Sequence, residues 1–136
     1  MPDGLAVADA VAFASALKNA GADYVCVSSG GIANVRIPVG PNYQVPFAAE
    51  VKSSVGIHTR AVGMIADANQ AEEVIASGQA DTVAVGRAFL DNPRWVWHAA
   101  ERLGAEDQMT YPPQYERSKR ALWAGAQLAR PGTASA

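Results

Sequence analysis

The sequence predicts an α/β fold in which a small parallel β-sheet is covered by helices. Three short apolar runs rich in β-branched residues are each followed by a segment with helical periodicity, and one more such segment precedes the first run. Each strand-to-helix unit takes about 30 residues, the usual size of such a unit. Because parallel strands need a crossover connection, this alternation predicts three parallel βα units preceded by a helix. The chain of 136 residues suffices for one domain with a core.

The helices are predicted from apolar periodicity and from the residues at their ends. The first runs from Val7 to Ala20, with its apolar residues on one face. A short helix over Phe47 to Ser53 begins with Pro46 as its first residue, because proline suits the first turn of a helix. Asp67 is the predicted N-cap of the next helix, and Gln70, three residues on, completes a capping box.

The strands are predicted over Tyr24 to Ser28, over the region Ile57 to Ile65, which ends in a glycine-containing turn, and over Thr82 to Val85. The last of these carries no charge, so we expect it to be buried on both faces of a parallel sheet. Cys26 is the single cysteine and is expected to act as a small buried hydrophobe. A long loop over residues 32–45, rich in glycine and proline, separates the first strand from the next helix, and long ordered loops tend to be functional.

Composition and charge exclude several classes of function. A net charge of −2 offers no electrostatic footprint for nucleic acid or for an anionic membrane. The N-terminus has no secretory signal pattern, and no stretch approaches the roughly 20 apolar residues of a membrane span. The lone cysteine has no partner for an internal disulfide, which favours the reducing cytoplasm. His58 and His98 lack a second ligand at metal spacing, so we predict no metal site.

Small and polar residues follow each predicted strand, at the edge where parallel strands end together. Ser28, Ser29 and Gly30 follow the first strand, Gly63 follows the second, and Gly86 with Arg87 follows the third. In (β/α)8 barrels the loops after the last two strands frequently form a phosphate site. A dinucleotide-binding glycine fingerprint is absent from the sequence.

Gly86 and Arg87 are the strongest candidates for a phosphate site. Glycine lets the backbone approach a ligand, and the planar guanidinium of Arg87 suits a phosphate dianion. If a helical turn begins here, the amides of Ala88, Phe89 and Leu90 should point toward the same ligand. The alternative remains open that Gly86 only ends a strand and that Arg87 pairs with a surface carboxylate.

Six motifs in a fixed order resemble those of a known family. They are Asp23 to Gly31, Tyr43 to Phe47, Ala61 to Ile65, Val85 to Arg87, Asp91 to Pro93 and Pro113 to Arg117. Each is weak alone, but together they resemble the Old Yellow Enzyme family, in particular its shorter bacterial ene-reductases, also called NADPH dehydrogenases or NADH:flavin oxidoreductases. The similarity covers most of the chain.

The resemblance implies a (β/α)8 TIM barrel that binds FMN, takes hydride from NADPH or NADH, and reduces the C=C bond of α,β-unsaturated carbonyl compounds. It implies that residues 1–117 are the C-terminal part of such a barrel and that residues 118–136 are an extension, partly helical and then flexible. The family's carbonyl-binding histidines, proton-donating tyrosine and flavin-contacting glutamine lie upstream, so no catalytic residue is predicted in this chain. A homo-oligomer or a partner chain that supplies the rest of the barrel is expected.

The resemblance also assigns roles to individual residues. Gly86 and Arg87 match the pair that holds the FMN phosphate, and Gly63 matches a backbone amide near it. Ser29 lies in the strand end below the flavin. Arg117 matches an arginine that reaches the active site of a neighbouring subunit. Simpler uses remain open: a tight turn for Gly63, a strand-end hydrogen bond for Ser29, and a local cap or ion pair for Arg117.

Two other functions remain open at this stage. A non-catalytic barrel fragment could associate with itself through its exposed strand edges, which proteins usually cover or pair. Another phosphate-binding (β/α)8 enzyme, such as a phosphosugar aldolase or isomerase, would share the phosphate site, because fold does not fix function.

Overall fold

The computed structural model describes residues 4–30 and 37–129 and contains a three-stranded parallel sheet. Its strands are β1 (Tyr24–Val27), β2 (His58–Ala61) and β3 (Thr82–Val83), and they lie in that order. In register, Cys26 pairs with Arg60, and Arg60 with Thr82. The predicted α/β fold with three parallel strands is therefore confirmed, while its place within a complete barrel stays a prediction.

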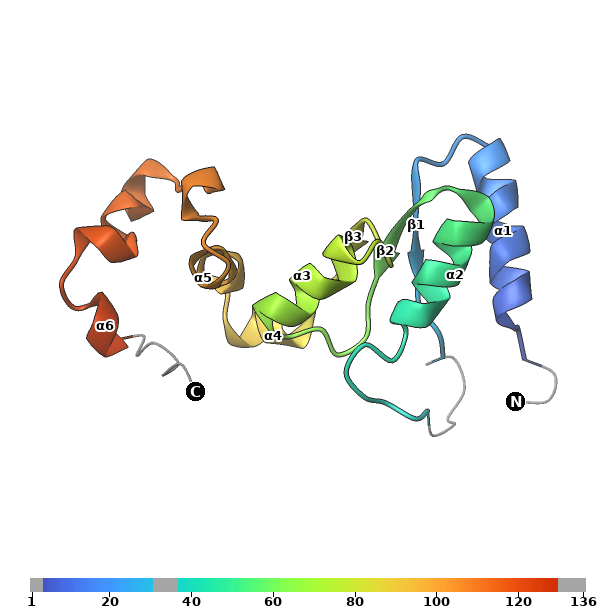
Figure 1. Cartoon of the computed structure of the whole chain (residues 1–136), viewed down its shortest axis with the longest axis horizontal. Coiled ribbons are helices and arrows are strands. Elements are labelled where there is room, and N and C mark those ends of the chain that lie inside the picture. The colour runs from blue at the N-terminus through green and yellow to red at the C-terminus, as the bar shows by residue number, and fades with distance from the viewer. Residues whose placement is uncertain (1–3, 31–36, 130–136) are drawn as a thin grey trace.

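The helices alternate with the strands and then continue alone toward the C-terminus (Figure 1). In chain order they are α1 (Val7–Asn19), α2 (Val45–Val55), α3 (Ala68–Ala76), α4 (Arg87–Asp91), α5 (Trp95–Arg102), the 3₁₀ segments η1 (Glu106–Gln108), η2 (Pro113–Ser118) and η3 (Arg120–Leu122), and α6 (Ala126–Ala129). Helices α1 and α6 lie at opposite ends of the long axis of the molecule.

End signals in the sequence explain where these helices begin. The Oδ1 atom of Asp67 accepts hydrogen bonds from the amides of Asn69 and Gln70 at 3.0 and 3.3 Å, and the side chain of Gln70 accepts one from the amide of Asp67. This confirms the predicted capping box, which satisfies amides that have no partner within the helix. Helix α2 begins at Val45, one residue before Pro46, because the buried Gln44 occupies the N-cap position.

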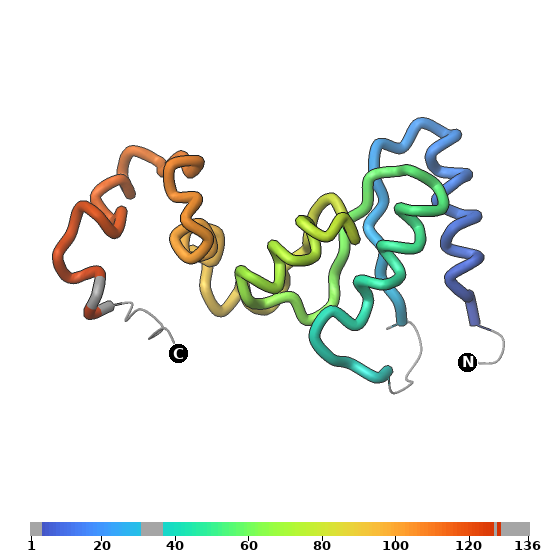
Figure 2. Tube along the Cα trace, viewed as in Figure 1, coloured from blue at the N-terminus to red at the C-terminus, as the bar shows by residue number. Residues whose placement is uncertain are grey.

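One face of the sheet packs against the helices and forms the core. Alternate residues of the strands point to this face, among them Val27, Ala61 and Val83. Helices α1 and α2 lie side by side over it (Figure 2). The buried core consists of Ala14, Val27, Val45, Ala48, Val51, Ile57, Ala61, Ile65, Ala71, Val74 and Ala80.

The opposite face of the sheet has no covering layer among the described residues. Tyr24, Cys26 and Thr82 are exposed there and Arg60 is half-buried, and these four residues are called the bare face below. The expectation that Cys26 is buried is wrong, because its side chain points away from the helices. The expectation that Thr82 to Val85 is buried on both faces is also wrong, for the same reason.

All three strands are shorter than predicted, β1 by one residue, since it ends at Val27. Strand β2 ends at Ala61, since Gly63 and Met64 both have positive φ angles, of 132° and 51°, and turn the chain. Among the described residues, strand β3 has β2 as its single neighbour, and it ends at Val83. The hydrogen-bond ladder between β2 and β3 continues by one further hydrogen bond, in which the amide of Ala84 donates to the carbonyl oxygen of Ala61 at 2.7 Å.

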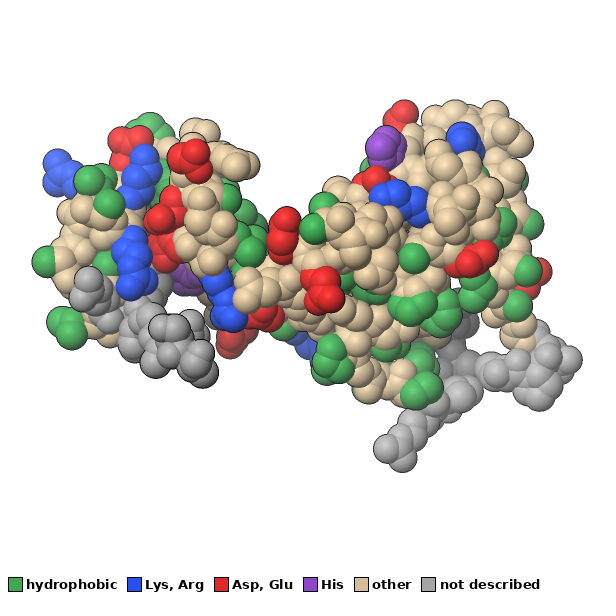
Figure 3. All heavy atoms as spheres, in the orientation of Figure 1, with side chains coloured by type: hydrophobic (Ala, Val, Ile, Leu, Met, Phe, Trp, Pro, Cys, Tyr) green, Lys and Arg blue, Asp and Glu red, His purple; other side chains and the backbone are tan. Residues whose placement is uncertain are grey.

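The C-terminal helices form a second lobe that meets the first beside α3, with a narrow waist between the lobes (Figure 3). The indole Nε1 of Trp95 donates to the carbonyl oxygen of Ala66 at 2.7 Å, and Arg102 pairs with Asp67 at 3.0 Å. These two contacts attach α5 to the start of α3. The flexible end of the extension was predicted at Pro131 to Ala136, and these residues lie outside the described residues.

Candidate functional site at the carboxyl ends of the strands

Four of the five predicted site residues lie at one edge of the sheet. Ser29 follows β1, Gly63 follows β2, and Gly86 with Arg87 follows β3. Because β1, β2 and β3 are parallel neighbours, these three segments leave the sheet side by side. Arg117 is not among them and lies in η2 of the C-terminal lobe. Part of the loop that was predicted to be functional, residues 32–36, lies outside the described residues.

Ser29 is held by a residue that sequence reasoning missed. The Oε1 atom of Gln44, a side chain only 3% exposed, accepts hydrogen bonds from the amide of Ser29 and from its hydroxyl at 3.1 Å. The hydroxyl of Ser28 donates to the same oxygen at 3.3 Å. This is the strand-end use that was left open for Ser29. The signal in the sequence was an amide residue two positions before Pro46, at the start of α2.

Gly63 has a structural reason to be glycine. Its φ of 132° is a conformation that other residues rarely adopt. A Cβ atom at this position would lie 3.0 Å from the ring of Tyr43 and 3.1 Å from the backbone nitrogen of Gln44. The close approach of Tyr43 accounts for Gly63 without a ligand.

The turn after β2 is further braced by Gln70. Its Nε2 atom donates to the carbonyl oxygen of Met64 and to the side-chain oxygen of Asn42, both at 2.8 Å. Among the residues that the structure describes, Asn42 and Met64 are the ones other than glycine with a positive φ angle. One side chain therefore holds both strained turns, which fixes the loop before α2 against the loop after β2.

At Gly86 and Arg87 the chain turns directly into the short helix α4, as predicted. However, the amides of Phe89 and Leu90 donate to the carbonyl oxygen of Gly86 at 2.9 and 3.2 Å. The expectation that they point to a ligand is wrong, because the first helical turn uses them internally. Only the first two amides of α4, those of Arg87 and Ala88, are left without a partner inside the helix.

The space around Gly86 and Arg87 is open. A Cβ atom at Gly86 would meet no atom within 4 Å. The side chain of Arg87 is exposed, and no hydrogen bond or ion pair engages it within residues 4–30 and 37–129. The alternative in which Arg87 pairs with a surface carboxylate of the described chain therefore finds no support. The arrangement leaves one cation, two amides and an uncrowded backbone at this edge.

Arg117 is exposed on η2, which packs against α5 through aromatic rings. Trp97 lies 4.7 Å from Tyr111 and 5.6 Å from Tyr115, measured between ring centroids. The guanidinium of Arg94 lies over the rings of both Trp97 and Tyr115, at 5.2 and 5.1 Å. These contacts fix the segment that carries Arg117.

The amino ends of the strands carry a different set of charges. Asp81 accepts a hydrogen bond from the amide of Thr59 at 2.8 Å and pairs with Lys52 at 3.0 Å. The Nδ1 atom of His58 lies 3.4 Å from the same carboxylate. The amide of Thr59 and then Lys52 lower the pKa of Asp81 to about 2. His58 thus takes part in a structural cluster at the start of β2.

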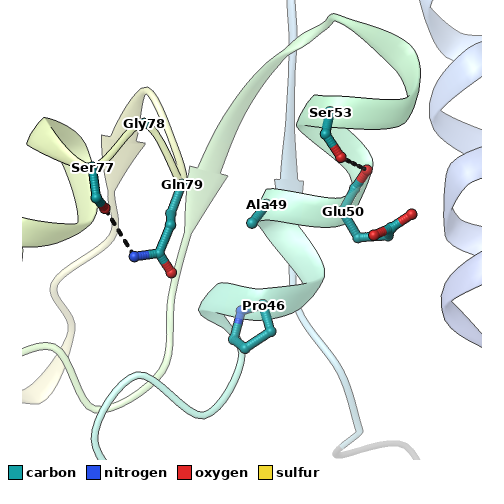
Figure 4. Close-up of a pocket in the computed structure, with 7 residues that line it drawn as sticks. All are labelled: Pro46, Ala49, Glu50, Ser53, Ser77, Gly78 and Gln79. Atoms are coloured by element: carbon teal, nitrogen blue, oxygen red, sulfur yellow. Dashed lines mark hydrogen bonds between the residues drawn. The ribbon is translucent and has the colours of Figure 1, made fainter.

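A shallow hollow lies away from the predicted site, between α2 and the turn after α3 (Figure 4). Its lining consists of Pro46, Ala49, Glu50, Ser53, Ser77, Gly78 and Gln79. The Nε2 atom of Gln79 donates to Ser77 at 2.8 Å, and Ser53 donates to the carbonyl oxygen of Glu50 at 3.1 Å. These polar groups are therefore occupied by their neighbours. Within the described parts of the chain, no group of three or more His, Cys, Asp and Glu side chains could hold a metal ion.

Together, the fold and this edge define a parallel α/β protein with the strand-end arrangement that commonly receives phosphorylated ligands. The sequence profile of the NADH:flavin oxidoreductase / NADH oxidase family matches residues 1–106. The chain belongs to this family, which confirms the resemblance found in its motifs. Among the described residues, no helix combines the length and the apolar character needed to cross a membrane.

Several NADPH dehydrogenases are similar to the chain. That of Geobacillus thermodenitrificans is 48% identical over 119 residues, which are 88% of this chain and 34% of the relative. That of Listeria monocytogenes serotype 4a is 44% identical over 115 residues, 85% of this chain and 33% of the relative. That of a further Geobacillus strain is 43% identical over 119 residues. The chain thus spans about a third of the length of the relatives that it matches.

Proposed function

We propose that the chain is the FMN-phosphate-binding part of an FMN-dependent NAD(P)H oxidoreductase that reduces the C=C bond of α,β-unsaturated carbonyl compounds. Its three βα units would form part of a (β/α)8 barrel, with the bare face turned toward the barrel interior. Support comes from the family, from the names of the relatives, and from a sheet that has helices on one face. The remaining strands would come from further chain or from a partner chain.

The observation that carries the proposal is the exposed guanidinium of Arg87, which no described residue pairs, beside the open backbone of Gly86. A phosphate dianion needs charge and hydrogen-bond donors, and this edge offers both without a competing carboxylate among the described residues. The amides of Arg87 and Ala88 would add two donors. The residues present therefore fit the phosphate group of FMN.

Bound FMN would supply the redox chemistry, taking hydride from NADPH or NADH and passing it to the β-carbon of the substrate. This chain would fix the phosphate with Arg87 and support the strand ends beneath the flavin with Ser29 and Gly63. Gln44 would hold Ser29 in place through its buried oxygen. Arg117 would be presented toward a neighbouring subunit by the aromatic contacts of η2.

The test is the affinity of FMN for the Arg87→Ala variant, followed by flavin fluorescence. Losing a charge-assisted pair of hydrogen bonds at a partly exposed site should weaken FMN by about 1.5 to 3 kcal/mol, on the order of 10- to 100-fold. Arg87→Lys keeps the charge but loses the planar set of guanidinium donors, so its FMN affinity should lie between those of the native chain and Arg87→Ala. Lys119→Ala is the matched control for loss of a remote cation. Unchanged FMN affinity in Arg87→Ala would remove the proposal.

A different phosphate-binding barrel enzyme is disfavoured by the family assignment. The second candidate that the structure favours is self-association, because the sheet has unpaired edges and a bare face.

A further inference from the structure

One side chain outside the proposed phosphate site connects two segments that the site uses. The indole Nε1 of Trp95 donates a hydrogen bond to the carbonyl oxygen of Ala66 at 2.7 Å. Ala66 lies three residues after Gly63, in the segment that follows β2, and Trp95 lies eight residues after Arg87, at the start of α5. This hydrogen bond therefore joins the segment after β2 to the segment after β3.

Ala66 is itself fixed by a second contact. Its amide donates to the Oε1 atom of Gln70 at 3.0 Å. The Nε2 atom of the same side chain donates to the carbonyl oxygen of Met64 at 2.8 Å and so braces the turn after β2. Both backbone polar groups of Ala66 are thus engaged, one by Gln70 and the other by Trp95. A residue held in this way is a suitable anchor for the helix that carries the indole.

A short path of hydrogen bonds connects Trp95 back to Arg87. The amide of Trp95 donates to the carbonyl oxygen of Asn92 at 2.9 Å, and the amide of Asn92, the C-cap of α4, donates to the carbonyl oxygen of Ala88 at 3.0 Å. The side chain of Asn92 accepts from the amide of Arg94 at 3.1 Å. Because α4 has five residues and none of them is buried, its position depends on the segment that follows it.

Trp95 is the stronger of the two contacts that attach α5 to the start of α3. Its side chain is half-buried and packs against the core, so the indole combines apolar burial with a satisfied N–H. The second contact is the ion pair of Arg102 with Asp67, in which 44% and 45% of the two side chains are exposed. Exposed ion pairs contribute little to stability. The position of α5, and of α4 before it, therefore depends mainly on Trp95.

We propose that Trp95 is a positioning residue of the phosphate site, whose indole N–H fixes α4, and with it Arg87, relative to the turn that contains Gly63. The inference rests on the proposed function, because the ligand in question is the phosphate of FMN. Gly63 and Arg87 follow neighbouring strands. A single phosphate can use both segments only when their separation is constant, and groups that bind a ligand need such support from the residues behind them. Trp95 thus acts through Arg87.

The test is a double-mutant cycle on FMN affinity, followed by flavin fluorescence. Trp95→Phe keeps an aromatic ring but loses the N–H, so it should weaken FMN about three- to tenfold, as expected for one hydrogen bond, and leave riboflavin, which lacks the phosphate, unchanged. In the Arg87→Ala background the same substitution should have no further effect. Trp123→Phe, the same substitution just after η3 in the C-terminal lobe, is the matched control and should change neither affinity.

A second readout needs no flavin. Amide hydrogen exchange of the ligand-free chain, measured by NMR, should become at least about fivefold faster at Leu90 and Asn92 in Trp95→Phe, while the amides of α1 keep their native rates and show that the fold is intact.

Unchanged exchange at Leu90 and Asn92 overturns the proposal. So does an equal loss of affinity for FMN and riboflavin, or a loss that persists in the Arg87→Ala background, because each of these assigns Trp95 a general structural role. A native chain that binds no FMN contradicts the proposed function instead, and the exchange rates then decide whether Trp95 fixes α4.

Discussion

The two ends of the strands differ in how their charges are used. At the amino ends, Asp81 is bound by Lys52, by the amide of Thr59 and by His58. At the carboxyl ends, Arg87 is exposed and unpaired within the described residues. In barrels of parallel strands the first end usually serves stability and the second serves ligands. The comparison teaches that the residue to test for function is the charged one without a partner.

The carboxyl edge of the sheet nevertheless depends on tightly packed turns, and the largest loss of stability should follow a substitution in the turn after β2. Gly63→Ala should destabilise the chain by about 2 to 3 kcal/mol, because it combines an unfavourable φ with contacts of 3.0 and 3.1 Å to Tyr43 and Gln44. Gly78→Ala is the control, since its φ is 76° but no atom lies within 4 Å of the new Cβ. Urea unfolding measures both. Equal losses would show that the packing of Tyr43 on Gly63 is unimportant.

Removing the side chain of Gln44 should have the next largest effect. Gln44→Ala breaks the hydrogen bonds to Ser28 and Ser29 and leaves a small cavity, so we expect a loss of about 1 to 2 kcal/mol. Gln79→Ala removes an exposed hydrogen bond from the side-chain amide of Gln79 to Ser77 and should lower stability by less than about 0.5 kcal/mol. Thermal unfolding followed by circular dichroism compares the two. A Gln44 variant as stable as the Gln79 variant would mean that the end of β1 is held by other contacts.

A smaller effect, visible through pH, is expected at the amino ends. The folded chain lowers the pKa of Asp81 to about 2, from an ordinary value of 3.8. The ionised carboxylate therefore stabilises the fold above about pH 4, and this contribution is lost as the pH falls from 3.8 toward 2. Because a quarter of the side chain is exposed, we expect about 1 kcal/mol.

Unfolding of Asp81→Asn as a function of pH measures this contribution. The variant should be less stable than the native chain at pH 6, and the two should converge near pH 2. A constant difference between them across this range would show that ionisation of Asp81 does not stabilise the fold.

The smallest effect on stability is predicted for Arg87→Ala, at under about 0.5 kcal/mol, because the side chain contacts no partner in the described chain. Denaturant midpoints of the variant and the native chain measure it. A loss comparable to that of Gly63→Ala would place Arg87 in the structural framework and would end the contrast between the two ends of the strands.

Local sequence signals predicted the parts of this structure that are decided locally. The capping box of Asp67 and Gln70 depends on residues three apart, and the order of strands and helices depends on periodicity. The exposure of Cys26 and Thr82 was not predicted, because burial on two faces needs a second layer that no local pattern reports.

At the candidate site too, local features were predicted from the sequence and contacts between distant residues were not. The position of Gly86 and Arg87 at a strand end was predicted from adjacent residues, but the use of the amides of Phe89 and Leu90 within α4 depends on the geometry of its first turn. The support of Ser29 by Gln44 was missed because it connects residues 15 apart through a buried side chain. Such contacts appear only once the loop before α2 is folded against β1.

The most direct test of the central claim is a fluorescence titration of the full chain with FMN, with riboflavin as the ligand that lacks the phosphate. We predict saturable binding of FMN that is at least about tenfold tighter than that of riboflavin, as expected when a charge-assisted contact to phosphate contributes about 1.4 kcal/mol or more. Equal affinity for both ligands, or no binding of either, would contradict the claim that Gly86 and Arg87 hold the phosphate in this chain.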